Sequence, residues 1–121
     1  MSKILVVDDA DSIRTALSRD LRAYGYQVST AENGLQALNL LKQEPDFNLL
    51  LVDLNMPIMN GLELVEAIRI DPILSPLNVL IMSTESSTAM RDRGRALKIA
   101  GWVLKPLHVA GLLSVAETLM E

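Results

Sequence analysis

Leu49-Leu50-Leu51-Val52-Asp53 is a run of four apolar residues that ends in a carboxylate, and it decides the fold. A run that is apolar on both faces is typical of a parallel strand covered by helices on each side. Similar runs begin at Ile4, Val28, Val79 and Val103, so that successive runs start 21 to 30 residues apart. Amphipathic patterns of helical period separate them. The sequence therefore predicts five strand–helix units.

Five such units favour an α/β fold, a doubly wound (βα)5 flavodoxin-like sandwich with a parallel five-stranded sheet in the order 2-1-3-4-5. Asp11 or Ser12 is expected to cap the first helix, Asn33 the second and Asn60 the third. The fourth helix, residues 86–100, has only a thin apolar stripe, so we expect it to be the most mobile.

Composition bounds the class of protein. The chain has 121 residues and a net charge of −4, which predicts a single domain over residues 1–121 with no output domain. The acidic balance, with no Lys/Arg cluster recognised, argues against nucleic acid and membrane surfaces as partners. The chain has no cysteine. The N-terminal apolar run is too short for a signal peptide or a membrane span, so we expect a cytoplasmic protein.

Charged and hydroxyl residues stand where the predicted strands end. Asp8-Asp9 follows the first strand, Asp53 ends the third, Ser83-Thr84 follows the fourth and Lys105 follows the fifth. Parallel strands bring these ends to one edge of the sheet. Three crowded carboxylates without His or Cys suit Mg²⁺, and a positioned Asp can accept a phosphoryl group. Asp53 is the predicted acceptor.

Each residue taken alone has a structural explanation. Asp8-Asp9 could cap a helix, Asp53 could stand in a turn, Thr84 could cap the fourth helix and Lys105 could be a solvated base. The coincidence of these residue types at four strand ends favours the phosphoryl-transfer site.

The stretches Val6-Val7-Asp8-Asp9, Val52-Asp53-Leu54-Asn55-Met56-Pro57-Ile58-Met59-Asn60-Gly61 and Trp102-Val103-Leu104-Lys105-Pro106, together with Thr84, resemble the receiver domain of two-component response regulators. The resemblance covers essentially the whole chain. Asn55, Thr84-Glu85-Ser86 and Gly101-Trp102 make it most similar to the stand-alone chemotaxis regulators of the CheY type.

The resemblance implies a role for each matching residue. Asp53 accepts a phosphoryl group from a histidine kinase, and Asp8, Asp9, Asp53 and the main-chain carbonyl of Asn55 hold Mg²⁺. Thr84 and Lys105 bind the phosphoryl oxygens. Thr84 and Trp102 together form the switch, and the Lys105–Pro106 peptide bond is cis.

The resemblance also implies partners. Phosphorylation changes the surface of the fourth strand and helix and the fifth strand and helix, whose downstream target is the flagellar motor switch; a phosphatase is a further candidate partner. The domain is then not an enzyme, because it catalyses only its own phosphorylation and dephosphorylation. A phosphate sink and a receiver-like scaffold without phosphoryl chemistry remain as alternatives. An aspartyl-phosphate phosphatase is disfavoured, because it needs an Asp where Asn55 stands.

Three residues depart from the family pattern. Glu85 is bulky and acidic where many receivers have a small residue, and Lys98 replaces a glycine at a position that often adopts a left-handed backbone. Leu107 replaces the usual Phe after Lys105-Pro106. His108 is given no role, because a lone exposed His is more often a solvated or capping residue than a ligand.

Overall fold

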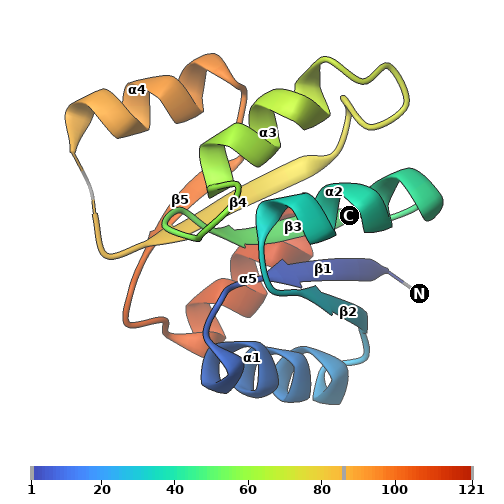
Figure 1. Ribbon diagram of the computed structural model, residues 1–121. Helices are drawn as coiled ribbons and strands as arrows, with labels where there is room; N and C mark the ends of the chain where they lie inside the picture. The colour runs from blue at the N-terminus through green and yellow to red at the C-terminus, as the bar shows by residue number, and fades with distance from the viewer. Residues whose placement is uncertain (1, 86, 121) are drawn as a thin grey trace.

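The computed structural model describes residues 2–85 and 87–120, which form a five-stranded sheet between two layers of helices (Figure 1). The strands are β1 (Lys3–Val7), β2 (Gln27–Ala31), β3 (Leu49–Asp53), β4 (Asn78–Ser83) and β5 (Gly101–Leu104). The helices are α1 (Asp11–Ala23), α2 (Gly34–Gln43), α3 (Gly61–Arg69), α4 (Thr88–Ala96) and α5 (Val109–Leu119). Strand and helix alternate along the chain, as predicted.

The sheet is parallel and has the order β2-β1-β3-β4-β5, which confirms the predicted topology. The chain winds outward from β1 to β2 and then returns past β1 to β3, so the winding direction reverses between β1 and β3. Val7 pairs with Ala31 on one side and with Val52 on the other. The carboxyl ends of β1 and β3 therefore lie side by side, where such sheets bind ligands.

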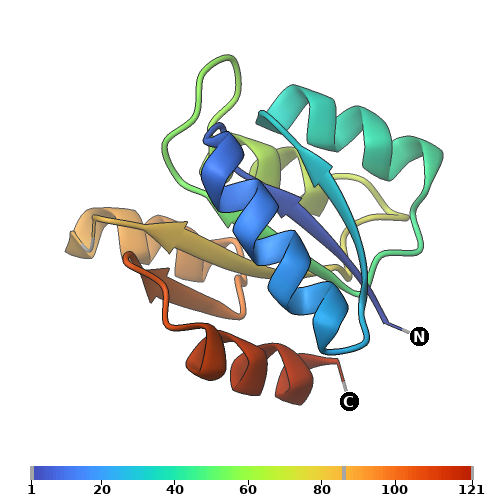
Figure 2. The same cartoon turned by 90° about the horizontal axis from the view of Figure 1, so that it is seen from below.

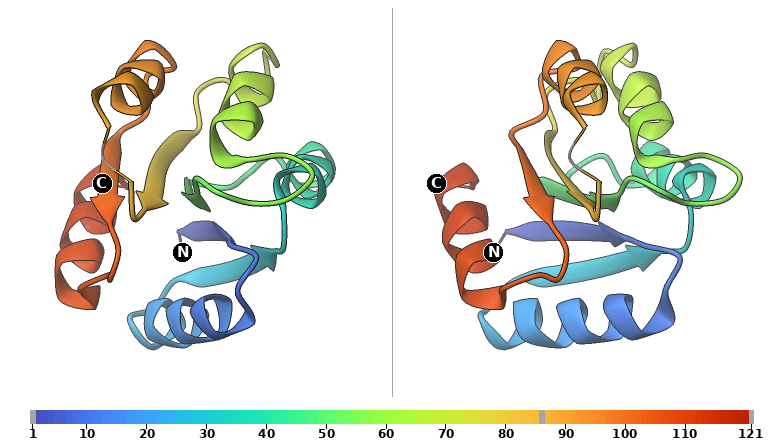
Figure 3. Two further views of the ribbon diagram at one scale, coloured as in Figure 1. Left: turned by 60° about the vertical axis from the view of Figure 1, so that its left-hand side comes forward. Right: turned by 90° about the vertical axis from the view of Figure 1, so that its left-hand side faces the viewer.

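Both faces of the sheet are buried, because successive side chains point to opposite sides. Ile4 and Val6 pack in a cluster with α1 and α5, whereas Leu5 and Val7 pack in a cluster with α2, α3 and α4. Figure 2 shows α1 and α5 in front of the sheet, and Figure 3 shows the two helix layers from the side. β3 is buried along its whole length.

The caps of α2 and α3 are confirmed. The Asn33 side chain accepts the backbone N–H of Gln36, and Asn60 and Glu63 form a reciprocal capping box that fixes the start of α3.

The predicted cap of α1 is wrong. The helix already begins at Asp11, and Ala10 stands at the N-cap position with no side-chain capping bond. The physical reason is that the Asp8 carboxylate accepts the backbone N–H of Ala10, at 3.0 Å, and so takes over the turn that leads into the helix.

α4 is shorter than predicted and packs thinly. It begins at Thr88, after Ser87 caps it, and Gly94 is its one fully buried position within the described residues; Ser86 lies outside them. The chain leaves it through Lys98, whose φ of 58° is the left-handed conformation that the sequence comparison raised for this non-glycine residue. The greater mobility of α4 stays a prediction.

Arg69, the last residue of α3, holds the exit of α4 in place. Its guanidinium donates to the carbonyls of Leu97 and Lys98, at 2.8 and 3.2 Å, and to those of Ser75 and Leu77, both at 2.7 Å. Burial lowers the pKa of Arg69 from its ordinary value. Because a guanidinium stays charged even so, one side chain joins the ends of α3 and α4 to the loop that enters β4.

Within the described ranges, no helix is both long enough and apolar enough to span a bilayer.

Candidate functional site

Three carboxylates meet at the carboxyl ends of β1 and β3, as predicted. Asp8 follows β1 and is fully buried, Asp53 ends β3 and is 7% exposed, and Asp9 is exposed to solvent. Each offers a carboxylate oxygen, and these oxygens all lie within 4.8 Å of one another. Three negative charges at this spacing repel each other unless positive charge is supplied.

Lys105 supplies one positive charge. Its Nζ lies 3.0 Å from Asp8 Oδ2 and 3.1 Å from Asp53 Oδ1, and its side chain is only 17% exposed. The Lys105–Pro106 peptide bond is cis, which confirms that prediction. The Lys105 backbone N–H donates to the Ser83 carbonyl, so the residue continues the pairing of β4 with β5. The lysine therefore reaches the acids from the neighbouring end of the sheet.

The electrostatics of the site favour protonation of the acceptor. Burial raises the pKa of Asp53 above its ordinary value, the charge of Asp8 raises it further, and Lys105 offsets only part of this rise. For Lys105, burial acts to lower the pKa, but the hydrogen bonds with Asp8 and Asp53 outweigh it, and the net shift is upward. The lysine therefore stays charged and binds the acids at neutral pH.

This donor set fits a hard divalent cation. The three nearby groups are carboxylates, and with Lys105 they leave two net negative charges when all are ionised. Mg²⁺ takes oxygen ligands and usually needs only one or two protein carboxylates. Asn55, the other predicted ligand, stands two residues beyond β3, and its side-chain amide donates to Glu85 Oε1 at 3.2 Å. That side-chain bond turns the amide toward Glu85.

The structure separates the two hydroxyl residues that follow β4. Ser83 is the last residue of the strand and is fully buried, and it lies in the sheet between Asp53 on β3 and Lys105 after β5. Its Oγ accepts the backbone N–H of Glu85 at 2.8 Å, which leaves the hydroxyl hydrogen free to be donated.

Thr84, the predicted ligand of the phosphoryl oxygens, lies one residue farther along and is exposed. It lines a cleft of about 500 Å³ between α1 and the start of α5, with Ile13 and Leu107 among its neighbours. The strand end thus brings Ser83, rather than Thr84, into the buried edge.

Trp102 joins the site to the outer surface of the sheet. Its indole N–H donates to the carbonyl of Glu85, at 2.8 Å, and its ring is half-buried. Glu85 is therefore held from three sides, because Asn55 binds its carboxylate, Ser83 binds its N–H and Trp102 binds its carbonyl. The sequence singled out Glu85 only as a departure from the family; the structure shows that it bridges the acceptor loop and β5.

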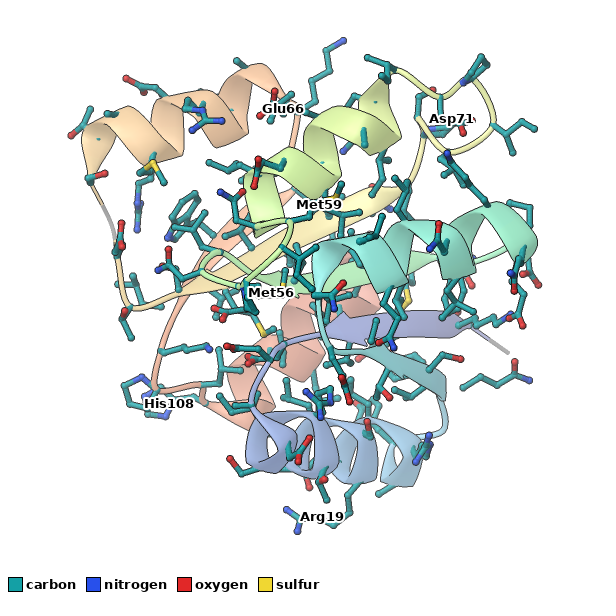
Figure 4. All side chains as sticks on the ribbon, in the orientation of Figure 1. Arg19, Met56, Met59, Glu66, Asp71 and His108 are labelled. Atoms are coloured by element: carbon teal, nitrogen blue, oxygen red, sulfur yellow. The ribbon has the colours of Figure 1, made fainter. Side chains whose placement is uncertain are left out.

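The loop after β3 closes tightly over the acceptor. A Cβ added to Gly61 would lie 2.5 Å from the carbonyl oxygen of Asp53 and 3.1 Å from Cα of Leu54, so only glycine fits there. Met56 and Met59 pack against the core cluster on the α2–α4 side, as expected for loop packing (Figure 4). The rigid loop fixes where the Asp53 side chain begins.

His108 lies away from the acidic edge. It is exposed, stands at the N-cap of α5 and makes no side-chain capping bond (Figure 4).

The sequence profile of the response regulator receiver domain matches residues 4–117. The chain belongs to this receiver domain family. Among curated proteins, the chain is 33% identical over 120 residues to the chemotaxis protein CheY-3 of Vibrio cholerae, covering 98% of this chain and 92% of that protein. It is 33% identical over 105 residues to the CheY homolog of Campylobacter jejuni, covering 86% and 81%. These relatives place it with the CheY-type receivers.

Solved structures agree with this placement. The chemotaxis response regulator CheY4 of Vibrio cholerae superposes with a TM-score of 0.90 at 36% identity, covering 98% of each chain. The receiver domain of a histidine kinase from Syntrophus aciditrophicus gives a TM-score of 0.90 at 25% identity, covering 99% of this chain and 90% of that one. The (βα)5 receiver fold and a role in two-component signalling, rather than in classical enzyme catalysis, follow from these matches.

Proposed function

We propose that this receiver is a phosphorylation-switched binding domain for chemotaxis, in which Asp53 is the phosphoryl acceptor. The observation that carries the proposal is the buried Asp53 carboxylate beside two further acids and one lysine, at the strand ends where the winding reverses. The relatives named as chemotaxis proteins support the choice of pathway. The corresponding phosphodonor is a histidine kinase, and the corresponding compartment is the cytoplasm.

In the proposed reaction, an Asp53 carboxylate oxygen attacks the phosphorus of the donor. A new P–O bond to Asp53 forms, the bond from phosphorus to the donor's histidine nitrogen breaks, and that nitrogen keeps the electron pair. The product is an acyl phosphate on Asp53. Phosphoryl transfer depends mostly on positioning and charge neutralisation, so the residues around Asp53 act by holding oxygens.

Asp8, Asp9, Asp53 and the main-chain carbonyl of Asn55 would hold Mg²⁺ in this scheme. When bound, the metal supplies positive charge to the phosphoryl oxygens. Lys105 already lies 3.1 Å from Asp53 Oδ1, so its ammonium can follow a phosphoryl oxygen on that residue. Ser83, being buried at the strand end, donates the hydroxyl hydrogen that the sequence assigned to Thr84.

The switch in this scheme acts through Glu85. When the Ser83 hydroxyl turns to a phosphoryl oxygen, its bond to the Glu85 N–H weakens, and the Glu85 carbonyl carries the Trp102 indole with it. The surface that changes is formed by β4, α4, β5 and α5. Its target, by the same reasoning from named relatives, is the flagellar motor switch, with a phosphate sink as the alternative outcome.

Intact mass spectrometry tests the acceptor. The protein is incubated with Mg²⁺ and a small acyl phosphate, and wild type is compared with Asp53→Asn, with a chelated sample and with Asp46→Asn as a matched exposed control. One phosphoryl group is expected on wild type and Asp46→Asn only when metal is present. No mass gain on wild type, or an equal gain on Asp53→Asn, would show that the acceptor is wrong and favour the scaffold.

A further inference from the structure

Positive charge is concentrated on α4 of this acidic chain. Four of the 11 basic residues, Arg91, Arg93, Arg95 and Lys98, lie within residues 91–98, which hold one acid, Asp92. This segment therefore carries +3 (4 − 1), and the rest of the chain carries −7 (7 bases against 14 acids). The sequence argument that the chain lacks a basic cluster is wrong for this helix.

The four cations differ in what they contact. Arg93 reaches across to Glu66 on α3, at 2.9 Å, and Figure 4 shows Glu66 on the part of α3 that lies near α4. Arg95 pairs with Asp92 on its own helix, at 3.1 Å, but both side chains are more than half exposed, so this pair is weak and easily exchanged.

Arg91 is the least satisfied of the four. Its guanidinium lies over the ring of Trp102, 5.9 Å from the centroid, and its buried Nε has no hydrogen-bond partner within residues 2–85 and 87–120. Among the ion pairs found in those residues, none involves Arg91.

Arg91 and Arg95 border a small groove. It has a volume of about 210 Å³ and lies between α4 and the start of β5, an edge strand of the sheet, with Ile99, Ala100, Gly101 and Trp102 as its other lining residues. Small-molecule pockets usually have roughly 300–1,000 Å³, so this groove suits one side chain of a larger partner. Its floor is apolar and its rim is cationic.

We propose that the α4–β5 groove docks an acidic peptide segment of the partner protein. An aliphatic side chain of the segment packs against Trp102 and Ile99, and its carboxylates bind Arg91 and Arg95. This rests on the proposed function, because Trp102 borders both the groove and the switch. Charge complementarity is the argument: the −7 of the remaining surface repels an acidic partner everywhere except at α4.

Nucleic acid fits this surface less well. The single exposed indole has Arg91 over one face, so it offers no open platform for stacked bases. Arg93 and Arg95 are paired with acids, which leaves few free cations for a phosphate backbone.

A peptide selection tests the proposal. A random library of 16-residue peptides is selected on the full chain in the presence of Mg²⁺ and a small acyl phosphate, and the net charge of the enriched peptides is compared with that of the input library. Enriched peptides are expected to carry two or more extra acids beside an aliphatic residue. Enrichment of peptides no more acidic than the input, or no enrichment, would overturn the proposal.

Variants then test the residues. Arg91→Gln combined with Arg95→Gln should weaken the selected peptides about five- to thirtyfold, whereas Arg19→Gln with Lys42→Gln, which removes the same charge elsewhere, should change binding less than twofold. Thermal melts confirm that both variants fold, and Arg95→Glu provides a single, fully exposed alternative. Equal weakening by the two double variants would contradict the groove, as would tighter binding of an oligonucleotide of sixteen thymidines than of the selected peptides.

The selection is repeated on Asp53→Asn so that the two proposals can fail separately. If acidic peptides are enriched equally on wild type and Asp53→Asn, the groove stands and the phosphorylation control fails. If only the phosphorylated protein selects peptides, and these are not acidic, the switch stands and the acidic partner is wrong.

Discussion

The two adjacent hydroxyl residues after β4 should differ sharply in their effect on phosphorylation. Ser83 is fully buried at the end of the strand between Asp53 and Lys105, whereas Thr84 is exposed and faces the cleft between α1 and α5. We therefore expect Ser83→Ala to slow phosphorylation strongly and Thr84→Ala to change it less than twofold.

The magnitude follows from the hydrogen bond that is lost. A hydrogen bond to a charged group contributes about 1.5–3 kcal/mol, and each 1.36 kcal/mol in the barrier changes a rate about tenfold. Because Ser83 would donate to a phosphoryl oxygen in the transition state, Ser83→Ala should slow phosphorylation about 10- to 100-fold. Ser83→Thr keeps the hydroxyl and should restore most of the rate.

Timed quenching followed by intact mass spectrometry measures this rate directly, at fixed Mg²⁺ and acyl phosphate. Urea unfolding of each variant is the control, because Ser83→Ala also removes the acceptor of the Glu85 N–H and should cost about 1 kcal/mol of stability. If Thr84→Ala is as slow as Ser83→Ala, or if Ser83→Ala keeps the wild-type rate, the assignment drawn from burial is refuted.

Three further variants test the electrostatics and the packing. Because burial and Asp8 raise the pKa of Asp53, the folded state holds that proton more tightly than the unfolded chain, and stability falls as the pH rises from about 3.8 through the folded pKa. Asp53→Asn should therefore be more stable than wild type at pH 7 in chelator, and the difference in urea midpoint should vanish below pH 4; a constant difference would contradict this. Lys105→Met leaves Asp8 and Asp53 without their cation and should lower the free energy of unfolding in chelator by about 2 kcal/mol, with recovery when Mg²⁺ is added; no loss in urea titrations would speak against the ion pairs. Arg69→Lys cannot reach four carbonyls and should cost about 2 kcal/mol and speed amide exchange around Leu97, whereas unchanged exchange there would remove Arg69 as the clamp of α4.

The acidic edge was predictable because strand ends and crossover rules act together. Once Val7 and Val52 are placed on neighbouring parallel strands, Asp8 and Asp53 must lie close to one another, whatever the details of the loops. Lys105 follows by the same reasoning from the end of β5.

The choice between Ser83 and Thr84 was beyond the sequence. Strand boundaries read from sequence are uncertain by a residue or two, and a shift of one residue turns a side chain to the opposite face of a sheet. Only the register of β4, with Ser83 opposite Leu104, settles which hydroxyl is buried.

Other features depend on contacts between distant segments. Arg69 binds carbonyls at positions 75, 77, 97 and 98, and Glu85 joins Asn55 to Trp102. Backbone acceptors leave no trace in the side-chain pattern, so no sequence signal announces Arg69. The basic residues of α4 were visible in the sequence, but the acidic balance of the whole chain masked them.

The central claim is that a phosphoryl group on Asp53 alters the surface around Trp102. The most direct measurement is the amide and indole NMR spectrum of wild type and Asp53→Asn, each recorded before and after addition of a small acyl phosphate with Mg²⁺. The account predicts that the Trp102 indole signal and the amides of residues 83–106 shift in wild type and stay fixed in Asp53→Asn. Phosphorylated wild type with an unchanged Trp102 indole and unchanged amides in α4 and β5 would contradict it.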